Sequence, residues 1–249
     1  MFDFLNIKKI KIINERPGIF IYKLFLEKDK KQIISYINAY LFLELQKNNE
    51  LKKFTEIFFL IPDGFGIYLM SRFLFGHKGL KERVVSTDVW IDIINICRQT
   101  DKKVFFYGGN KIDKKEFNNA INKRFPGLKI AGYADGYSSE GNKVFSEINK
   151  SGCDILFVGL GTPKQEKWTY ENYRYLNVPV IITVGSAIDF ISGFRKRAPE
   201  FIRKYALEWL YRLFQEPGRL WRRYLFGIPV FLFKMISLKF NLRKNDINN

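Results

Sequence analysis

Cysteine and histidine are scarce in this chain of 249 residues, which contains two cysteines and one histidine. Cys97 and Cys153 lie far apart in apolar surroundings, a pattern that favours two buried, reduced thiols. So few cysteines fit a reducing compartment. Without a cluster of cysteine and histidine residues, a structural zinc site is not expected.

The chain also lacks a run of about 18 apolar residues, the length that indicates a transmembrane helix. The nearest approach is Leu225–Phe233, which is too short to span a bilayer but long enough to lie in its interface. The opening segment scatters charges among its apolar residues and has no small-residue cleavage site. We therefore expect no secretory signal.

Three motifs of nucleotide enzymes are missing. Gly159-x-Gly161 is followed by Lys164 where the dinucleotide fingerprint GxGxxG needs a third glycine, and no GxxxxGK[ST] sequence is present. No two aspartates lie two residues apart, so there is no Asp-x-Asp clamp for a metal and a nucleotide sugar. A Walker-type ATPase is therefore excluded. A nucleotide-sugar enzyme of this sequence would neutralise diphosphate with Arg, Lys and backbone N–H groups.

Positive charge is abundant: 42 Lys and Arg residues against 25 Asp and Glu give a net charge of +17. This balance predicts attraction to nucleic acid, an anionic bilayer or phosphorylated substrates. From residue 195 onward there are 13 basic and four acidic residues, so over half of the net charge lies in the last quarter of the chain. In Arg197–Arg223 the arginines are interleaved with large aromatic residues, which suits a surface carrying both phosphate and hydrocarbon.

Short apolar runs alternate with longer amphipathic stretches through the middle of the chain. The predicted strands are Gln32–Asn38, Ile57–Ile61, Lys103–Tyr107, Leu128–Ala131, Asp154–Val158 and Pro179–Thr183. The predicted helices are Tyr40–Phe54, Phe65–Phe75, Thr87–Thr100, Asp113–Phe125, Glu140–Lys150 and Lys164–Tyr175. Strands of continuous apolarity are typical of a parallel sheet covered on both faces. The predicted fold class is α/β, a doubly wound, mostly parallel, Rossmann-like sheet whose ligand lies at the carboxyl ends of the strands.

The pattern changes after Asp189. Pro199 is well placed to begin a helix, Pro217-Gly218 breaks the pattern, and a second amphipathic stretch runs from Arg219 to about Lys239. We therefore expect an α/β core over residues 1–194, a basic helical appendage over 195–240 and a polar, disordered tail over 241–249.

Loops after three of the predicted strands carry candidate functional residues. Asp63 follows a buried strand and precedes glycine, a pattern that fits either a general base or the cap of the next helix. Gly108-Gly109 and the Gly159–Lys164 loop fit either phosphate binding at a helix N-terminus or tight turns.

Taken in order, several segments resemble the WecG/TagA/CpsF group, glycosyltransferase family 26. The resemblance covers about residues 30 to 225, and its PKQE block together with its RAP…EWLYR…P block is specific. The matching segments are Ile37-Asn38-Ala39, Pro62-Asp63-Gly64, Glu82-Arg83-Val84, Asp88, Gly108-Gly109, Asp135-Gly136-Tyr137, Val158-Gly159-Leu160-Gly161, Pro163-Lys164-Gln165-Glu166, Val184-Gly185, Asp189, Gly193, Arg197-Ala198-Pro199, Glu208-Trp209-Leu210-Tyr211-Arg212 and Pro217.

The resemblance implies an inverting, metal-independent transferase without a cofactor. Such an enzyme moves a hexosamine-type sugar, similar to N-acetylmannosamine, from UDP to a polyprenyl-diphosphate-linked N-acetylglucosamine for a bacterial surface glycan such as teichoic acid or capsule. It implies work as a peripheral protein at the cytoplasmic face of the bacterial inner membrane, on an anionic surface. It also allows a homo-oligomer, to which an exposed apolar tail is prone.

The resemblance also implies roles for individual residues. Asp63 becomes the general base, with Arg83 and Gln165 as further catalytic residues. The donor site takes Asn38, Lys164 and Asp189, together with Gly108, Gly109, Gly159 and Gly161, which let the backbone approach UDP. Arg212, Arg219 and Arg222 share one helical face if the helix continues past Pro217-Gly218, and they close over the lipid diphosphate or bind anionic lipid only.

Three positions depart from the family pattern. Tyr36 stands where some members have threonine, and Ser86 and Ser186 stand where members often have glycine. Tyr36 and Ser186 put the identity of the transferred sugar in doubt, though not the reaction type. Two alternatives stay open: a basic nucleic-acid-binding protein, and a soluble nucleotide-sugar enzyme such as an epimerase.

Overall fold

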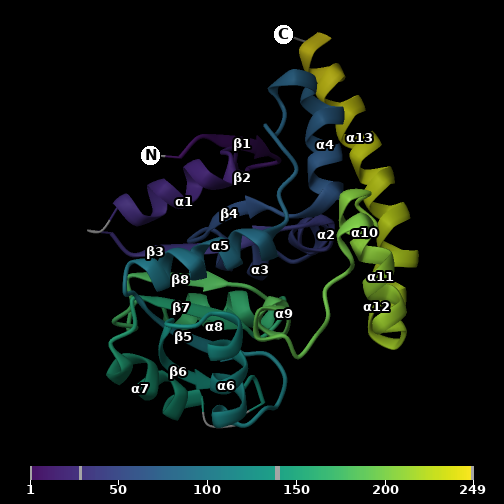
Figure 1. Ribbon diagram of the computed structural model, residues 1–249. Helices are drawn as coiled ribbons and strands as arrows, with labels where there is room; N and C mark the ends of the chain where they lie inside the picture. The colour runs from purple at the N-terminus through teal and green to yellow at the C-terminus, as the bar shows by residue number, and fades with distance from the viewer. Residues whose placement is uncertain (1, 28–29, 138–140, 248–249) are drawn as a thin grey trace.

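The computed structural model describes residues 2–27, 30–137 and 141–247, and a single twisted sheet organises them (Figure 1). Its eight described strands lie in the order β1-β2-β4-β3-β8-β7-β5-β6, and only the β1–β2 pair is antiparallel. The strands are β1 Phe4–Ile7, β2 Ile10–Ile13, β3 Gln32–Ile37, β4 Phe59–Pro62, β5 Lys103–Gly108, β6 Lys129–Ala134, β7 Ile155–Gly159 and β8 Val180–Thr183. The predicted fold class is confirmed.

Two helical layers cover the sheet. The helices of the α/β part are α1 Pro17–Leu26, α2 Ala39–Lys47, α3 Asn49–Thr55, α4 Gly64–Phe75, α5 Ser86–Gln99, α6 Lys114–Arg124, α7 Gly141–Ser151, α8 Lys164–Asn172 and α9 Ala187–Ser192, with a short 3₁₀ turn η1 at Gly76–Lys78. One core cluster joins the sheet to α2, α3, α4, α7 and α8, and the other joins it to α1, α5, α6 and α9. Phe105 faces the first cluster and its neighbour Phe106 the second, as expected for a strand buried on both faces.

The N-terminal hairpin and α1 were not predicted. Lys8 and Lys9, which join β1 to β2, both have positive φ (49° and 66°), a conformation that two-residue hairpins usually obtain from Asn-Gly or Asp-Gly. The sequence therefore carries no turn signal there. The predicted helix Tyr40–Phe54 is in fact two helices, because the side chain of Asn48 accepts a hydrogen bond from Leu51 N and begins α3. Glu140, the predicted start of another helix, lies outside the described residues.

In the described chain, four helices follow α9: α10 Glu200–Lys204, α11 Glu208–Gln215, α12 Pro217–Leu225 and α13 Gly227–Ile247. The helical conformation is interrupted at Glu216, where φ is −136°, and Pro217 begins a new helix. The predicted break at Pro217-Gly218 is therefore confirmed, and the condition under which Arg212, Arg219 and Arg222 would share one helical face is not met. α13 also runs on through residue 247, where a disordered tail was expected.

Helix α13 packs lengthwise beside α4 and also contacts α2 (Figure 1). Phe231, Met235 and Leu238 are buried in the core cluster, and Lys239 Nζ donates to the carbonyl of Leu74 at 2.8 Å. By length and composition alone, the run Pro217–Asn241 is long and apolar enough to cross a membrane, a criterion that core helices of soluble proteins also meet. The apolar run seen in the sequence was shorter. The domain boundaries at residues 194 and 240 stay a prediction.

Candidate active site

The carboxyl ends of β4, β3, β8, β7 and β5 lie side by side along one edge of the sheet. The loops that follow these strands carry Asn38, Asp63, Gly109, Gly161 and Gly185. Residues widely separated in sequence therefore meet at this edge, as expected for the ligand site of a parallel α/β sheet.

Asp63 is half-buried immediately after β4. Its side chain makes no capping bond to its own helix α4; instead Oδ1 accepts a hydrogen bond from the backbone N–H of Ser86, the first residue of α5, at 2.9 Å. Within the described part of the chain, the other carboxylate oxygen has no hydrogen-bond partner. One oxygen fixes the orientation of the carboxylate and the other is available, an arrangement that suits a general base.

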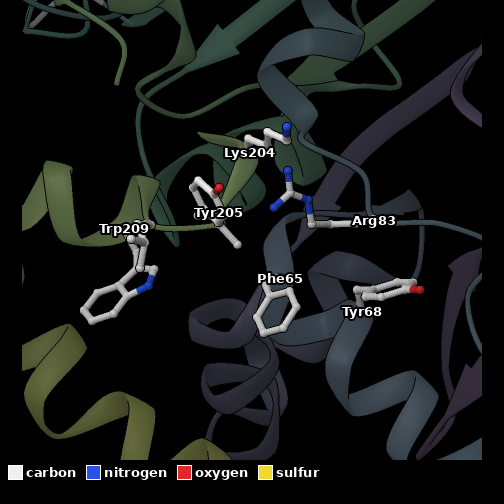
Figure 2. A pocket seen from close by; sticks show the side chains of 8 residues that line it. Phe65, Tyr68, Arg83, Lys204, Tyr205 and Trp209 are labelled. Atoms are coloured by element: carbon white, nitrogen blue, oxygen red, sulfur yellow. The ribbon is translucent and has the colours of Figure 1, made fainter. Parts of the chain in front are cut away.

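A cavity of about 460 Å³ lies between α4, the helix that begins directly after Asp63, and the C-terminal helices. Figure 2 shows Phe65 and Tyr68 of α4 on one side of it, Arg83 between the walls, and Lys204, Tyr205 and Trp209 on the other. Ala206 and Leu207 complete the lining. Arg83 donates from Nη2 to the carbonyl of Arg203 at 3.0 Å. The cavity thus combines aromatic walls with two cations, a composition suited to an amphipathic, anionic ligand.

Ion pairs hold the C-terminal segment against α5. Arg197 donates to Asp88 Oδ1 at 2.6 Å, and Arg203 lies 3.7 Å from the same oxygen. Burial raises the pKa of Glu208 on α11; Arg197 lowers that pKa and the charge of Asp63 raises it. Glu208 is therefore close enough to Asp63 for the two carboxyl groups to interact electrostatically.

Gln165 is fully buried beneath the site. Its Oε1 accepts from the N–H of Gly185 at 2.9 Å, and its Nε2 donates to Glu166 Oε1 at 2.8 Å. Thr162 Oγ1 donates to the same Glu166 oxygen at 3.0 Å. Burial raises the pKa of Glu166, and its Oε2 has no partner among the described residues. Both ends of the Gln165 amide are therefore used inside the protein, which makes this residue a support for the loop after β8.

Three of the four site glycines are required by close packing within the protein, against backbone at Gly108 and Gly159 and against a side chain at Gly109. A Cβ on Gly108 would lie 2.4 Å from the carbonyl carbon of Gly159, one on Gly159 would lie 2.6 Å from the Gly185 oxygen, and one on Gly109 would lie 2.9 Å from Ile188. Gly161, with φ of +77°, faces open space. Close packing of the loops therefore accounts for glycine at three of these positions, and the expectation that all four let the backbone approach UDP stays a prediction.

The remaining predicted donor-site residues have different surroundings. Asn38 Oδ1 accepts from Leu41 N at 3.0 Å and caps α2. Asp189 is buried, and its Oδ1 accepts from the N–H of Asn110, the residue after Gly109, at 3.0 Å. Burial raises the pKa of Asp189, which the Asn110 bond and Arg195 lower. Lys164 is exposed at the start of α8. Asn38 and Asp189 thus hold loops of the site, and Lys164 lies at its solvent side.

The three C-terminal arginines do not share a helical face. Arg212 on α11 donates from Nη2 to Ser186 Oγ at 2.9 Å, in the loop after β8. Arg219 pairs with Glu216, and the guanidinium of Arg222 lies 5.1 Å from the centre of the Trp221 ring. Of the three, Arg212 is the one that the structure places against a loop of the site.

Two side chains near the site were not singled out from the sequence. Glu166 was quoted only as part of the PKQE block, and nothing local signals that its carboxyl is buried. Arg223 lies in the arginine-rich segment, and its guanidinium stands 4.3 Å from the centre of the Tyr40 ring. Burial raises the pKa of Tyr36 and the charge of Glu166 raises it further, whereas the charge of Arg223 lowers it.

Comparison with known sequences decides the family. A profile described as the glycosyl transferase WecG/TagA/CpsF family matches residues 10–245. The chain belongs to this family. It is therefore a glycosyltransferase, and the resemblance stated from its motifs is confirmed.

Curated relatives cover most of the chain. A protein of Bacillus spizizenii is 34% identical over 209 residues, which are 84% of this chain and 80% of the relative. One of Bacillus subtilis is 32% identical over 217 residues, 86% and 83% of the two chains. One of Staphylococcus aureus strain MW2 is 27% identical over 222 residues, 89% and 83%. All three are named N-acetylglucosaminyldiphosphoundecaprenol N-acetyl-beta-D-mannosaminyltransferase.

Proposed function

We propose that this glycosyltransferase moves an N-acetylmannosamine-like sugar from UDP to a polyprenyl-diphosphate-linked N-acetylglucosamine, with inversion and without a metal ion. The names of the relatives support the acceptor and the sugar class. The observation that supports the chemistry is the Asp63 carboxylate, which accepts from Ser86 N–H directly before α4. Phe65 on that helix and Arg83 line the cavity.

In this mechanism the free oxygen of Asp63 takes the proton of the acceptor hydroxyl. The hydroxyl oxygen forms a bond to the anomeric carbon from the face opposite the nucleotide, and the bond from that carbon to the diphosphate oxygen breaks. UDP leaves with the electron pair, so the configuration inverts. In this proposal Arg83 and Arg212 donate to the diphosphate, whose charge grows as the bond breaks.

Metal independence has two supports in the chain. The sequence has no Asp-x-Asp pair. Across the described ranges, no group of three or more Asp, Glu, His or Cys side chains is placed to hold a metal ion. Arginine donors take the electrostatic role that a divalent ion has in metal-dependent transferases.

We further propose that the enzyme works at an anionic membrane surface, at the cytoplasmic face of a bacterial inner membrane. Exposed large apolar side chains gather on α4, α12 and α13: Phe65, Leu69, Phe73, Leu225, Phe226, Val230, Leu232, Phe233, Ile236 and Phe240. Arginines and lysines lie among them, including Arg222 and Lys234. A surface both apolar and cationic favours an anionic bilayer over a nucleic acid, which gains little from exposed aliphatic groups.

The test is a transfer assay with purified full-length enzyme, UDP-N-acetylmannosamine and a short-chain prenyl-diphosphate N-acetylglucosamine. We expect a disaccharide product of inverted anomeric configuration, read by mass spectrometry and NMR, at an equal rate in EDTA. UDP-N-acetylglucosamine, UDP-glucose and UDP-galactose serve as competing donors. Turnover that stops in EDTA, or sugar conversion without the lipid acceptor, contradicts the proposal.

A further inference from the structure

The loop after β8 ends in a serine whose hydroxyl is not used in the usual way. Ser186 occupies the position before α9, where serine commonly accepts a hydrogen bond from an N–H group of its own helix. Here the hydroxyl makes no such bond and accepts instead from Nη2 of Arg212 at 2.9 Å. The bond joins the α/β part of the chain to α11 across 26 residues.

Ser186 stands on a rigid support. Its neighbour Gly185 donates its N–H to the buried Gln165 amide at 2.9 Å, and Val184 N donates to the carbonyl of Val158 at 2.7 Å. A Cβ on Gly185 would lie 2.5 Å from the hydroxyl of Tyr36, so this stretch of backbone has no room to shift toward β3. Groups that orient a functional side chain work best from such a fixed element.

Arg212 is held on a second side but keeps donors free. Its guanidinium carbon lies 5.6 Å from the centre of the Phe190 ring, which belongs to α9 and is buried. Arginine has five N–H donors in a planar fork. Apart from the bond to Ser186, the described residues give this guanidinium no hydrogen-bond partner, and Nε is buried without one. The free donors match the oxygens of a diphosphate.

We propose that Ser186 is a positioning residue that holds Arg212 ready for the departing diphosphate of the sugar donor. The inference rests on the proposed function. The support runs through contacts, from Glu166 to Gln165, to the Gly185 N–H, and to the Ser186 hydroxyl that orients the guanidinium. Because the diphosphate gains charge as the glycosidic bond breaks, this orientation acts on kcat more than on the KM of the donor.

The experiment compares full-length wild type with Ser186→Ala, Ser186→Thr, Arg212→Ala and the double variant Ser186→Ala/Arg212→Ala in the transfer assay described above. We expect Ser186→Ala to lower kcat about tenfold, the order of one charge-assisted hydrogen bond partly replaced by water, with the donor KM within about twofold. Ser186→Thr keeps the hydroxyl and restores kcat. In the Arg212→Ala background, Ser186→Ala has no further effect, because the residue acts through the arginine.

The matched control is Ser192→Ala on the same helix. Ser192 is buried, whereas Ser186 is half-buried, and the Ser192 hydroxyl donates only to the carbonyls of Ile188 and Asp189 within α9. Its loss should leave the donor kinetics unchanged, with a small loss of stability.

The outcomes separate the two proposals. A wild-type enzyme without transfer to the lipid acceptor contradicts the proposed function. An active wild type in which Ser186→Ala keeps its kcat, or loses the same factor with and without Arg212, overturns the positioning role alone. Hydrogen exchange of α11 gives an independent measurement: about tenfold faster exchange in Ser186→Ala than in Ser192→Ala supports the contact, and equal exchange contradicts it.

Discussion

Replacing Asp63 tests its two proposed roles separately, because one carboxylate oxygen accepts a hydrogen bond within the fold and the other has no partner among the described residues. In Asp63→Asn, the remaining carbonyl oxygen can still accept from Ser86 N–H, which lies 2.9 Å from Oδ1. In Asp63→Ala that acceptor is lost. The two variants should therefore differ in stability but not in chemistry.

For activity, we expect both variants to lose about 10²- to 10⁴-fold in kcat, the usual contribution of a general base. For stability, Asp63→Asn should unfold within about 0.5 kcal/mol of wild type, and Asp63→Ala should lose about 1 kcal/mol, the net value of one hydrogen bond. Initial rates at saturating donor and acceptor measure the first quantity, and urea unfolding measures the second.

The control is Asp92→Asn, an aspartate on the outer side of α5 that lines a separate groove with α1. It should keep full activity. A kcat of Asp63→Asn within about threefold of wild type would show that another group removes the proton. Equal stability of Asp63→Ala and wild type would show that the Ser86 contact has no role in the fold.

Further predictions concern the groups around the site. Burial raises the pKa of Glu166, so the folded protein favours the protonated carboxyl. The contribution of this group to stability is therefore present at low pH and falls as the pH rises above about 4.3, the ordinary pKa, through the folded pKa. Glu166→Gln does not titrate, so the difference in melting temperature between this variant and wild type should grow from pH 5 to pH 8, and a constant difference would contradict a buried, titrating carboxyl. Gly108→Ala should lower the free energy of unfolding by about 3 kcal/mol, measured in denaturant, because its Cβ meets backbone. Gly161→Ala, in open space, should lower it by about 1–2 kcal/mol from its positive φ alone. Equal losses would refute the packing argument. Asp88→Asn weakens two ion pairs of a half-exposed carboxylate, so we expect a loss of about 1 kcal/mol in unfolding free energy and about fivefold faster proteolysis of the α10–α11 segment. Unchanged resistance to proteolysis would show that these ion pairs do not hold the segment against α5.

The parallel sheet was predictable because its physical cause is local. Strands such as Lys103–Gly108 are apolar without alternation, and both faces are buried, so composition and length suffice. The β1–β2 hairpin was not predictable, since Lys8 and Lys9 adopt positive φ without any residue type that favours it. Local propensity carries no information about such a turn.

The position of Asp63 could also be predicted, because a residue that follows a buried strand must lie at the edge of the sheet. The roles of Gln165 and Gly108 could not. The Gln165 amide is satisfied by Gly185, 20 residues away, and Gly108 packs on Gly159, 51 positions further along the chain. Contacts over such separations exist only once the sheet has formed. A sequence motif therefore indicates that these residues belong to the site, but it does not indicate which residues they contact.

Helix α13 is packed against α2 and α4, and these two helices begin directly after Asn38 and Asp63. Its 21 residues form a helix about 30 Å long, which can hold the start of α4 at a set distance from any surface that contacts the outer side of α13. If that surface is a bilayer, Asp63 lies at a fixed height above the lipid. An acceptor sugar is held at a set distance from the bilayer by its own lipid diphosphate. The enzyme would then select acceptors whose sugar lies at the height of Asp63, in addition to selecting them by chemical recognition.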